Sequence, residues 1–168
     1  QLTSDLIDLN ELLRDYSSSS SKSDTAYQLE FPERINFNLT TDIDRLIFRR
    51  FDARDIEGGL KLKNQKLIAS NLKFGSMNGL VELNGLIDAS GTRLLVSCDA
   101  DIRDINITKM FHTFENFGQK YITESNIQGI GTADLQFVSV WEKDLKVIED
   151  KIYAKADITI VKGALINN

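Results

Sequence analysis

The sequence predicts a mainly β fold: a long, curved, largely antiparallel sheet, with two short amphipathic helices. Hydrophobic and polar residues alternate along several stretches, as expected for strands with one buried face. Short polar or glycine-containing breaks separate these stretches, which is typical of hairpins. Only one proline occurs in 168 residues, and this fits strands that pair on both sides.

The longest alternating stretches predict the principal strands, at Arg34–Ile43, Arg93–Ile102 and Ile152–Ile160. Shorter ones cover residues 56–62, 68–74, 81–87 and 133–137. A nine-residue strand spans roughly 30 Å at ~3.3 Å per residue. Strands of sandwiches are usually shorter, so the length favours an open β-groove, while the composition fits a closed sandwich equally well.

The breaks between these stretches predict hairpin turns at Asn64-Gln65, Ser76–Gly79 and Ala89–Gly91. The pair Gly58-Gly59 lies inside an alternating stretch, which predicts a bulge or bend instead of a chain reversal.

Two segments change to a helical period. One apolar stripe predicts a helix near residues 106–117, with Asn106 as its N-cap and Gly118 as its stop. The stripe consists of Ile107, Met110, Phe111, Phe114 and Phe117. A shorter stripe with Asn10 as its cap predicts a helix close to the N-terminus, formed by Leu9, Leu12, Leu13 and Tyr16.

The length suits a single domain over residues 1–168. Within it we expect the end of a preceding strand-helix unit at 1–16, a flexible serine-rich loop at 17–30 and the main sheet at 31–168. Because the chain starts at Gln1 without a signal peptide and stops inside a strand-like stretch, we expect a fragment of a larger protein.

Two internal echoes raise the prospect of a repeated unit. Asp5–Asn10 and Asp101–Asn106 share the form Asp-aliphatic-x-Asp-aliphatic-Asn, and each is expected to end a strand and open a helix. Ile56-Glu57-Gly58 is likewise similar to Ile127-Gln128-Gly129.

Composition and motifs exclude several classes of function. A net charge of −5 and a pI near 4.9 disfavour nucleic acid as a partner. His112 is the only histidine and sits among stripe residues, while Cys98 lies on the apolar side of a strand. We therefore expect no enzyme, no cofactor and no metal site. No apolar stretch reaches the ~20 residues of a membrane-spanning helix.

The remaining candidate for a functional surface is the apolar side of the sheet. If the sheet is open, this side forms a groove that holds acyl chains; if it is closed, the same residues are core. The candidate lipid-facing residues are Phe37, Leu39, Leu62, Leu72, Phe74, Leu83, Val96, Phe137 and Ile158. The candidates for a helix that caps the groove are Met110, Phe111, Phe114 and Phe117.

An ordered series of motifs resembles the C-terminal region of AsmA-family proteins, particularly the Bacteroidetes versions. The series begins with Phe111–Gln119, continues through Asn126–Gly129 and ends with Ile152–Asn167. The resemblance is strongest over residues 93–168 and looser over 34–92.

The resemblance implies a periplasmic protein anchored in the inner membrane by a helix outside this chain. It also implies a role in outer-membrane biogenesis, since the family is similar to TamB and the bridge-like lipid-transfer proteins, whose β-grooves are associated with phospholipid transport. Phospholipid or another hydrophobic ligand is then the expected partner, together with envelope assembly proteins. The alternative is a non-enzymatic scaffold or adhesin-like β-sandwich without lipid.

Overall fold

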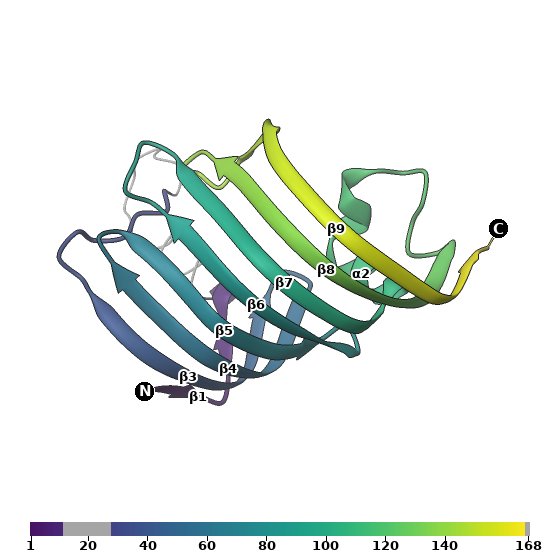
Figure 1. Ribbon diagram of the computed structural model, residues 1–168, viewed down its shortest axis with the longest axis horizontal. Coiled ribbons are helices and arrows are strands. Elements are labelled where there is room, and N and C mark those ends of the chain that lie inside the picture. The colour runs from purple at the N-terminus through teal and green to yellow at the C-terminus, as the bar shows by residue number, and fades with distance from the viewer. Residues whose placement is uncertain (12–27, 167–168) are drawn as a thin grey trace.

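The computed structural model describes residues 1–11 and 28–166 and shows an open, curved, mixed sheet of nine strands (Figure 1). The predicted mainly β fold class is confirmed. The strands are β1 (Leu2–Ser4), β2 (Ile7–Asp8), β3 (Phe37–Phe48), β4 (Phe51–Lys63), β5 (Lys66–Ser76), β6 (Gly79–Asp88), β7 (Leu94–Asn106), β8 (Ile127–Trp141) and β9 (Val147–Leu165). The helix α2 (Ile107–Thr113) and the 3-10 helix η1 (Glu115–Gly118) lie between β7 and β8.

Strands β3 to β9 form an antiparallel meander in which each strand pairs with the next along the chain, while β1 and β2 pair parallel to β3. Two of the predicted hairpin turns have left-handed residues at both central positions, as type I′ turns require. The φ angles are 52° and 59° for Asn64 and Gln65, and 49° and 67° for Met77 and Asn78. The predicted turn at 89–91 also joins two neighbouring strands, β6 and β7.

Bulges keep hydrophobic side chains on one face where simple alternation would fail. Asp55, Asn71 and Asp104 have left-handed backbones, with φ of 52°, 48° and 54°, at or beside shifts in strand register. Each is followed by an aliphatic residue of the apolar side: Ile56, Leu72 and Ile105. Each bulge adds one residue to its strand. The side chains after the bulge therefore still place the hydrophobic residues on the apolar side, although the strict alternation along the sequence is interrupted.

The bulge predicted at Gly58-Gly59 is confirmed, because the register between β4 and β5 shifts on both sides of Glu57. Gly58 has φ +147°, and Gly129 in the echoing segment has the same φ and also lies at a register shift. The echo between residues 56–58 and 127–129 therefore has a common backbone geometry.

The pairing register divides the side chains between two faces, because directly paired residues of an antiparallel sheet point the same way. One face, the apolar face, is hydrophobic across the meander from β3 to β9. Its larger side chains are Phe37, Leu39, Ile43, Ile56, Leu60, Leu62, Leu67, Leu72, Phe74, Val81, Leu83, Ile87, Val96, Ile102, Leu135, Phe137, Ile152, Ile158 and Ile160. The opposite face, the polar face, carries most of the charged strand residues.

One end of the apolar face is covered close to α2. A buried cluster there consists of Ile43, Ala53, Ile56, Phe74, Val81 and Ile105. Leu2 and Ile7 of the short strands pack against it, as does Met110 of α2. The helix itself starts at a capped end, since the Asn106 side chain accepts a hydrogen bond from the Lys109 backbone N–H at 2.9 Å.

Residues 28–36 cross the other end of the sheet. The Leu29 N–H donates to the Lys143 carbonyl at 2.8 Å, and the Gln65 side chain donates to the Phe31 carbonyl at 3.0 Å. At this end of the sheet, Ala89 and Leu94 are buried. The two ends of the sheet are thus covered by different segments of the chain.

Three predicted boundaries are wrong. Strand β3 begins at Phe37 instead of Arg34, because the Ile35 N–H donates to the Pro32 carbonyl in a turn. The helix near 106–117 ends at Thr113, since Asn116 and Phe117 have φ of 56° and 54°.

The third wrong boundary is the start of the N-terminal helix, of which residues 9–11 are described. Its cap is Asp8, whose carboxylate accepts from the N–H groups of Asn10 and Glu11. Asn10, the predicted cap, instead accepts from the Arg49 N–H at 2.7 Å. The predicted helix residues Leu12, Leu13 and Tyr16, and most of the predicted serine-rich loop, lie outside the described residues.

Candidate functional site

The nine candidate lipid-facing residues all lie on the apolar face. Their positions follow from the register: Phe37 is opposite Leu62, and Leu72 is opposite Leu83. The remaining candidates pair with other residues of the same face; Phe137, for example, is opposite Cys98. The set therefore comes from every strand of the meander and forms part of one surface.

Exposure along this surface increases toward β9. Leu62 and Phe74 are buried, with exposed fractions of 4% and 9%, whereas Leu83 and Val96 in the middle of the sheet are half-buried. Ile158 on β9 is 63% exposed. The apolar face thus combines a packed region near α2 with a region that a hydrophobic ligand can reach.

The exposed region carries several small side chains. Ala133 lies on β8 and Ala154 and Ala156 on β9, all on the apolar face. A row of paired residues crosses from β5 to β9 without a polar side chain: Leu72, Leu83, Ala100, Leu135 and Ala156. An acyl chain lying along such a row meets only hydrocarbon.

The four candidate capping residues do not form one helical stripe. Met110 packs against the buried cluster, but Phe114 and Phe117 lie beyond the end of α2 and are 47% and 55% exposed. Phe117 contacts Phe111 edge to face with ring centroids 5.2 Å apart, and it stacks with Phe114 at 5.5 Å. These rings form a small exposed aromatic cluster beside the helix.

This cluster faces the β3–β4 hairpin. Phe114 and Glu115 line a hollow of about 240 Å³ together with Phe48, Arg49 and Phe51. The hollow is therefore partly aromatic and lies at the covered end of the sheet.

The polar face has a different chemistry. Ion pairs hold neighbouring strands, including Lys73 with Glu82 at 2.7 Å and Arg45 with Asp52 at 2.8 Å. The Arg45 guanidinium holds the pKa of the Asp52 carboxyl below its ordinary value by hydrogen bonding.

Four directly paired carboxylates cross the polar face from β6 to β9: Glu82, Asp101, Asp134 and Asp157. They border a hollow of about 370 Å³. Arg103 offsets part of this charge through contacts with Asp101 at 2.5 Å and Asp134 at 3.6 Å. A dense carboxylate row favours water over hydrocarbon, so the two faces differ sharply in what they accept.

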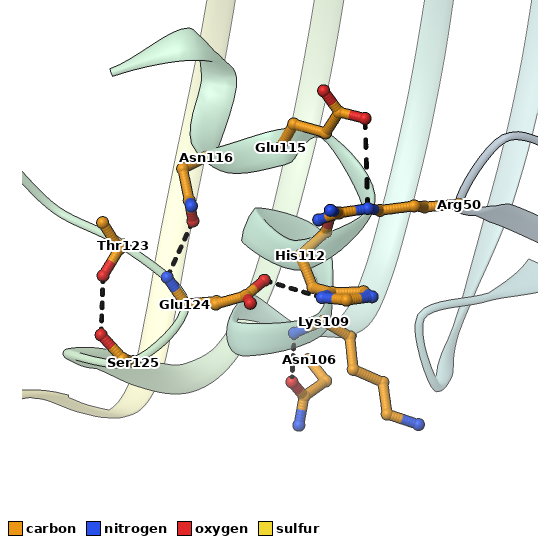
Figure 2. Close-up of polar contacts among 9 residues, drawn as sticks. All are labelled: Arg50, Asn106, Lys109, His112, Glu115, Asn116, Thr123, Glu124 and Ser125. Atoms are coloured by element: carbon orange, nitrogen blue, oxygen red, sulfur yellow. Dashed lines mark hydrogen bonds and ion pairs between the residues drawn. The ribbon is translucent and has the colours of Figure 1, made fainter. Parts of the chain in front are cut away.

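The single histidine, His112, lies in the last turn of α2 and contacts the segment that follows the helix (Figure 2). His112 Nδ1 is 2.8 Å from a Glu124 carboxylate oxygen, and the Glu124 N–H donates to the Asn116 side chain. Glu115 lies 4.0 Å from Arg50 of the β3–β4 hairpin. These contacts tie the segment after α2 to the rest of the chain.

Cys98 lies on the apolar face, opposite Gly85 and Phe137. Burial raises the pKa of its thiol, and the nearby Asp99 charge raises it further. This environment disfavours the reactive thiolate. Over residues 1–11 and 28–166, no group of three or more histidine, cysteine or acidic side chains has a geometry suited to a metal ion.

Sequence reasoning found the apolar face but missed three features of the site. It did not find the carboxylate row, because that row joins residues far apart in the sequence. It missed the exposure of β9, which depends on the order of strands in the sheet. It also missed Gly131, where the Ile107 side chain of α2 rests against the sheet.

No protein-family model matches this chain, and neither a curated protein nor a solved structure matches it. Within the described residues, no helix combines the length and the hydrophobicity that crossing a membrane requires.

Proposed function

We propose that this chain is a periplasmic segment of an AsmA-like protein that acts in outer-membrane biogenesis, and that its apolar face binds phospholipid acyl chains. The observation that carries the proposal is the continuity of this face, which runs from β3 to β9 without a charged side chain. The ordered motifs of residues 93–168 support the family assignment.

The driving force is the burial of hydrocarbon. Each acyl CH₂ removed from water contributes about 0.8 kcal/mol. Half of a bilayer's hydrocarbon core is roughly 15 Å thick, whereas a 13-residue strand such as β7 spans roughly 43 Å. The surface is therefore large enough to lie against an extended acyl chain.

The arrangement of rows supports movement as well as binding. Because the row from Leu72 to Ala156 is apolar at every strand, a chain shifts from one strand to the next without contacting a charge. The headgroup remains in water at the open side of the face. Conduction along the groove then requires no catalytic residue, and an inner-membrane anchor outside this chain would fix the location of the segment.

Native mass spectrometry of the protein, purified without harsh detergent, tests the proposal. We expect bound phospholipid, with less of it in a Val96→Thr variant. Val96 is half-buried on the apolar face, and replacing a methyl group by a hydroxyl there makes contact with hydrocarbon less favourable by roughly 0.5–2 kcal/mol.

Val138→Thr is the matched control, since Val138 pairs with Ser97 and Tyr153 on the polar face. It should leave the bound lipid unchanged. Lipid-free protein would instead support the alternative of a scaffold or adhesin-like module. Equal lipid loss in both variants would show that the lipid does not bind specifically to the apolar face.

A further inference from the structure

Strand β9 is a long edge of the sheet (Figure 1, yellow). It has 19 residues and pairs with β8 on one side, and no strand of the described chain pairs with its other side. Its side chains are largely exposed on both faces of the sheet, including Ile158 on the apolar face and Tyr153 on the polar face.

The central part of this edge is regular. From Ile152 to Ile160, β9 pairs with β8 without a register shift, and the shifts lie outside this stretch. It contains no proline and no glycine, and its apolar side carries no charge. Natural proteins usually protect such edges with bulges, prolines or inward-pointing charges, because unpaired N–H and C=O groups are a template for another strand.

The polar side of β9 indicates what that strand must carry. Asp157 ends the carboxylate row and lies directly beside Asp134, which in turn pairs with Asp101. Like charges in directly opposite positions are destabilising. A strand that places a positive charge next to Asp157 would relieve this repulsion.

The β9 sequence supplies that charge itself. If two copies of β9 pair antiparallel around Ala156, Lys155 of each copy lies opposite Asp157 of the other. On the apolar side the same register places Ala154 opposite Ile158 and Ile152 opposite Ile160.

Neighbouring registers are less favourable. If the two copies paired around Lys155 or around Asp157, that residue would lie opposite the same residue of the other copy, and two identical charges would meet. If the two-fold axis passed between two neighbouring residues, each apolar-face residue would lie opposite a polar-face residue. Lys155 and Asp157 are the only charged residues from Ile152 to Ile160, so within this regular stretch only the register centred on Ala156 places lysine opposite aspartate.

We propose that β9 is a self-association edge, at which two copies of this chain join antiparallel with Ala156 on the two-fold axis. This axis is perpendicular to the sheet, so the two apolar faces lie on the same side and become continuous. The inference rests on the edge and its charges and stands independently of lipid binding.

Single cysteines test the register directly. In a Cys98→Ala background, Ala156→Cys should form a disulfide-linked dimer under mild oxidation, because directly opposite Cα atoms lie roughly 4.5–5.5 Å apart. Ala154→Cys and Ile158→Cys are the matched controls. Each lies about 13 Å from its own copy at ~3.3 Å per residue, so neither should crosslink alone, but a mixture of the two should.

Charge reversal gives a second test. In sedimentation measurements, Lys155→Asp or Asp157→Lys should each weaken the dimer at least tenfold, and the double variant should recover most of the affinity. Circular dichroism checks that the variants remain folded. A monomer at all concentrations, equal crosslinking at residues 154, 156 and 158, or no recovery in the double variant would overturn the proposal.

Discussion

The side chain of Ile107, the first residue of α2, occupies the position that a side chain on Gly131 of β8 would need. A Cβ atom built on Gly131 would lie 2.6 Å from Ile107 Cδ1, well inside van der Waals contact. Ile107 is buried, and the helix packs mainly on β8 and β7. This contact fixes α2 against the covered end of the apolar face.

Gly131→Ala should therefore destabilise the protein by about 1–3 kcal/mol through overpacking. Ile107→Val removes the Cδ1 atom and should alone cost roughly 0.5–1.5 kcal/mol. In the double variant the two losses should not add, because the added methyl enters the space that Cδ1 leaves. Denaturant unfolding of the four proteins measures this coupling, and strictly additive losses would show that the two residues do not compete for space.

The two adjacent glycines of β4 should respond differently to the same substitution. Gly58 has φ +147°, and a Cβ atom there would lie 2.8 Å from the Asn71 carbonyl oxygen. Gly58→Ala should cost at least ~1–3 kcal/mol from backbone strain. Gly59→Ala is the control, since its Cβ atom would stand 3.6 Å from its nearest neighbour, the Ser70 carbonyl oxygen. Equal unfolding free energies for the two variants would contradict the bulge geometry.

The Asp88 carboxylate makes folding stability depend on pH. Hydrogen bonds from Lys66 and Ser90 lower its pKa from 3.8 to about 2. A carboxyl with a depressed folded-state pKa stabilises the fold above its unfolded pKa and loses this contribution as pH falls through the folded value. The stability difference between wild type and Asp88→Asn should therefore be constant at pH 5–7 and shrink between about pH 4 and pH 2.

Unfolding free energies measured across this range test the prediction. Asp44→Asn, at an exposed position of β3, serves as a control for loss of a surface charge. A difference that stays flat from pH 7 to pH 2 would show that the Lys66 and Ser90 contacts do not lower the pKa of Asp88.

The sequence predicted the strands because their signal is local. Alternation and polar turns are read within ten residues, so the meander and the side of the sheet that Phe37 or Val96 faces followed directly. The end of the helix was missed because no glycine or proline occurs between Thr113 and Phe117, where the backbone leaves the helical conformation. The cap at Asp8 was missed because Asn10 is held by the distant Arg49.

No local pattern in the sequence predicts that part of the apolar face is exposed. Phe74 and Ile158 look equivalent in the sequence, yet one is buried under the cluster near α2 and the other lies on an edge strand. Which segment covers which strand depends on contacts between distant parts of the chain. The same holds for the carboxylate row, whose members meet only through the register.

The reactivity of Cys98 tests the central claim most directly, because this thiol lies on the apolar face while its neighbour Ser97 lies on the polar face. We would measure modification by a small maleimide with and without a short-chain phosphatidylcholine below its micelle concentration, in wild type and in a Cys98→Ala/Ser97→Cys variant. Comparing rates within each protein cancels the raised pKa of Cys98. Lipid bound to the apolar face predicts a several-fold slower reaction at Cys98 and an unchanged rate at position 97. Equal rates with and without lipid at both positions would contradict lipid binding on this face.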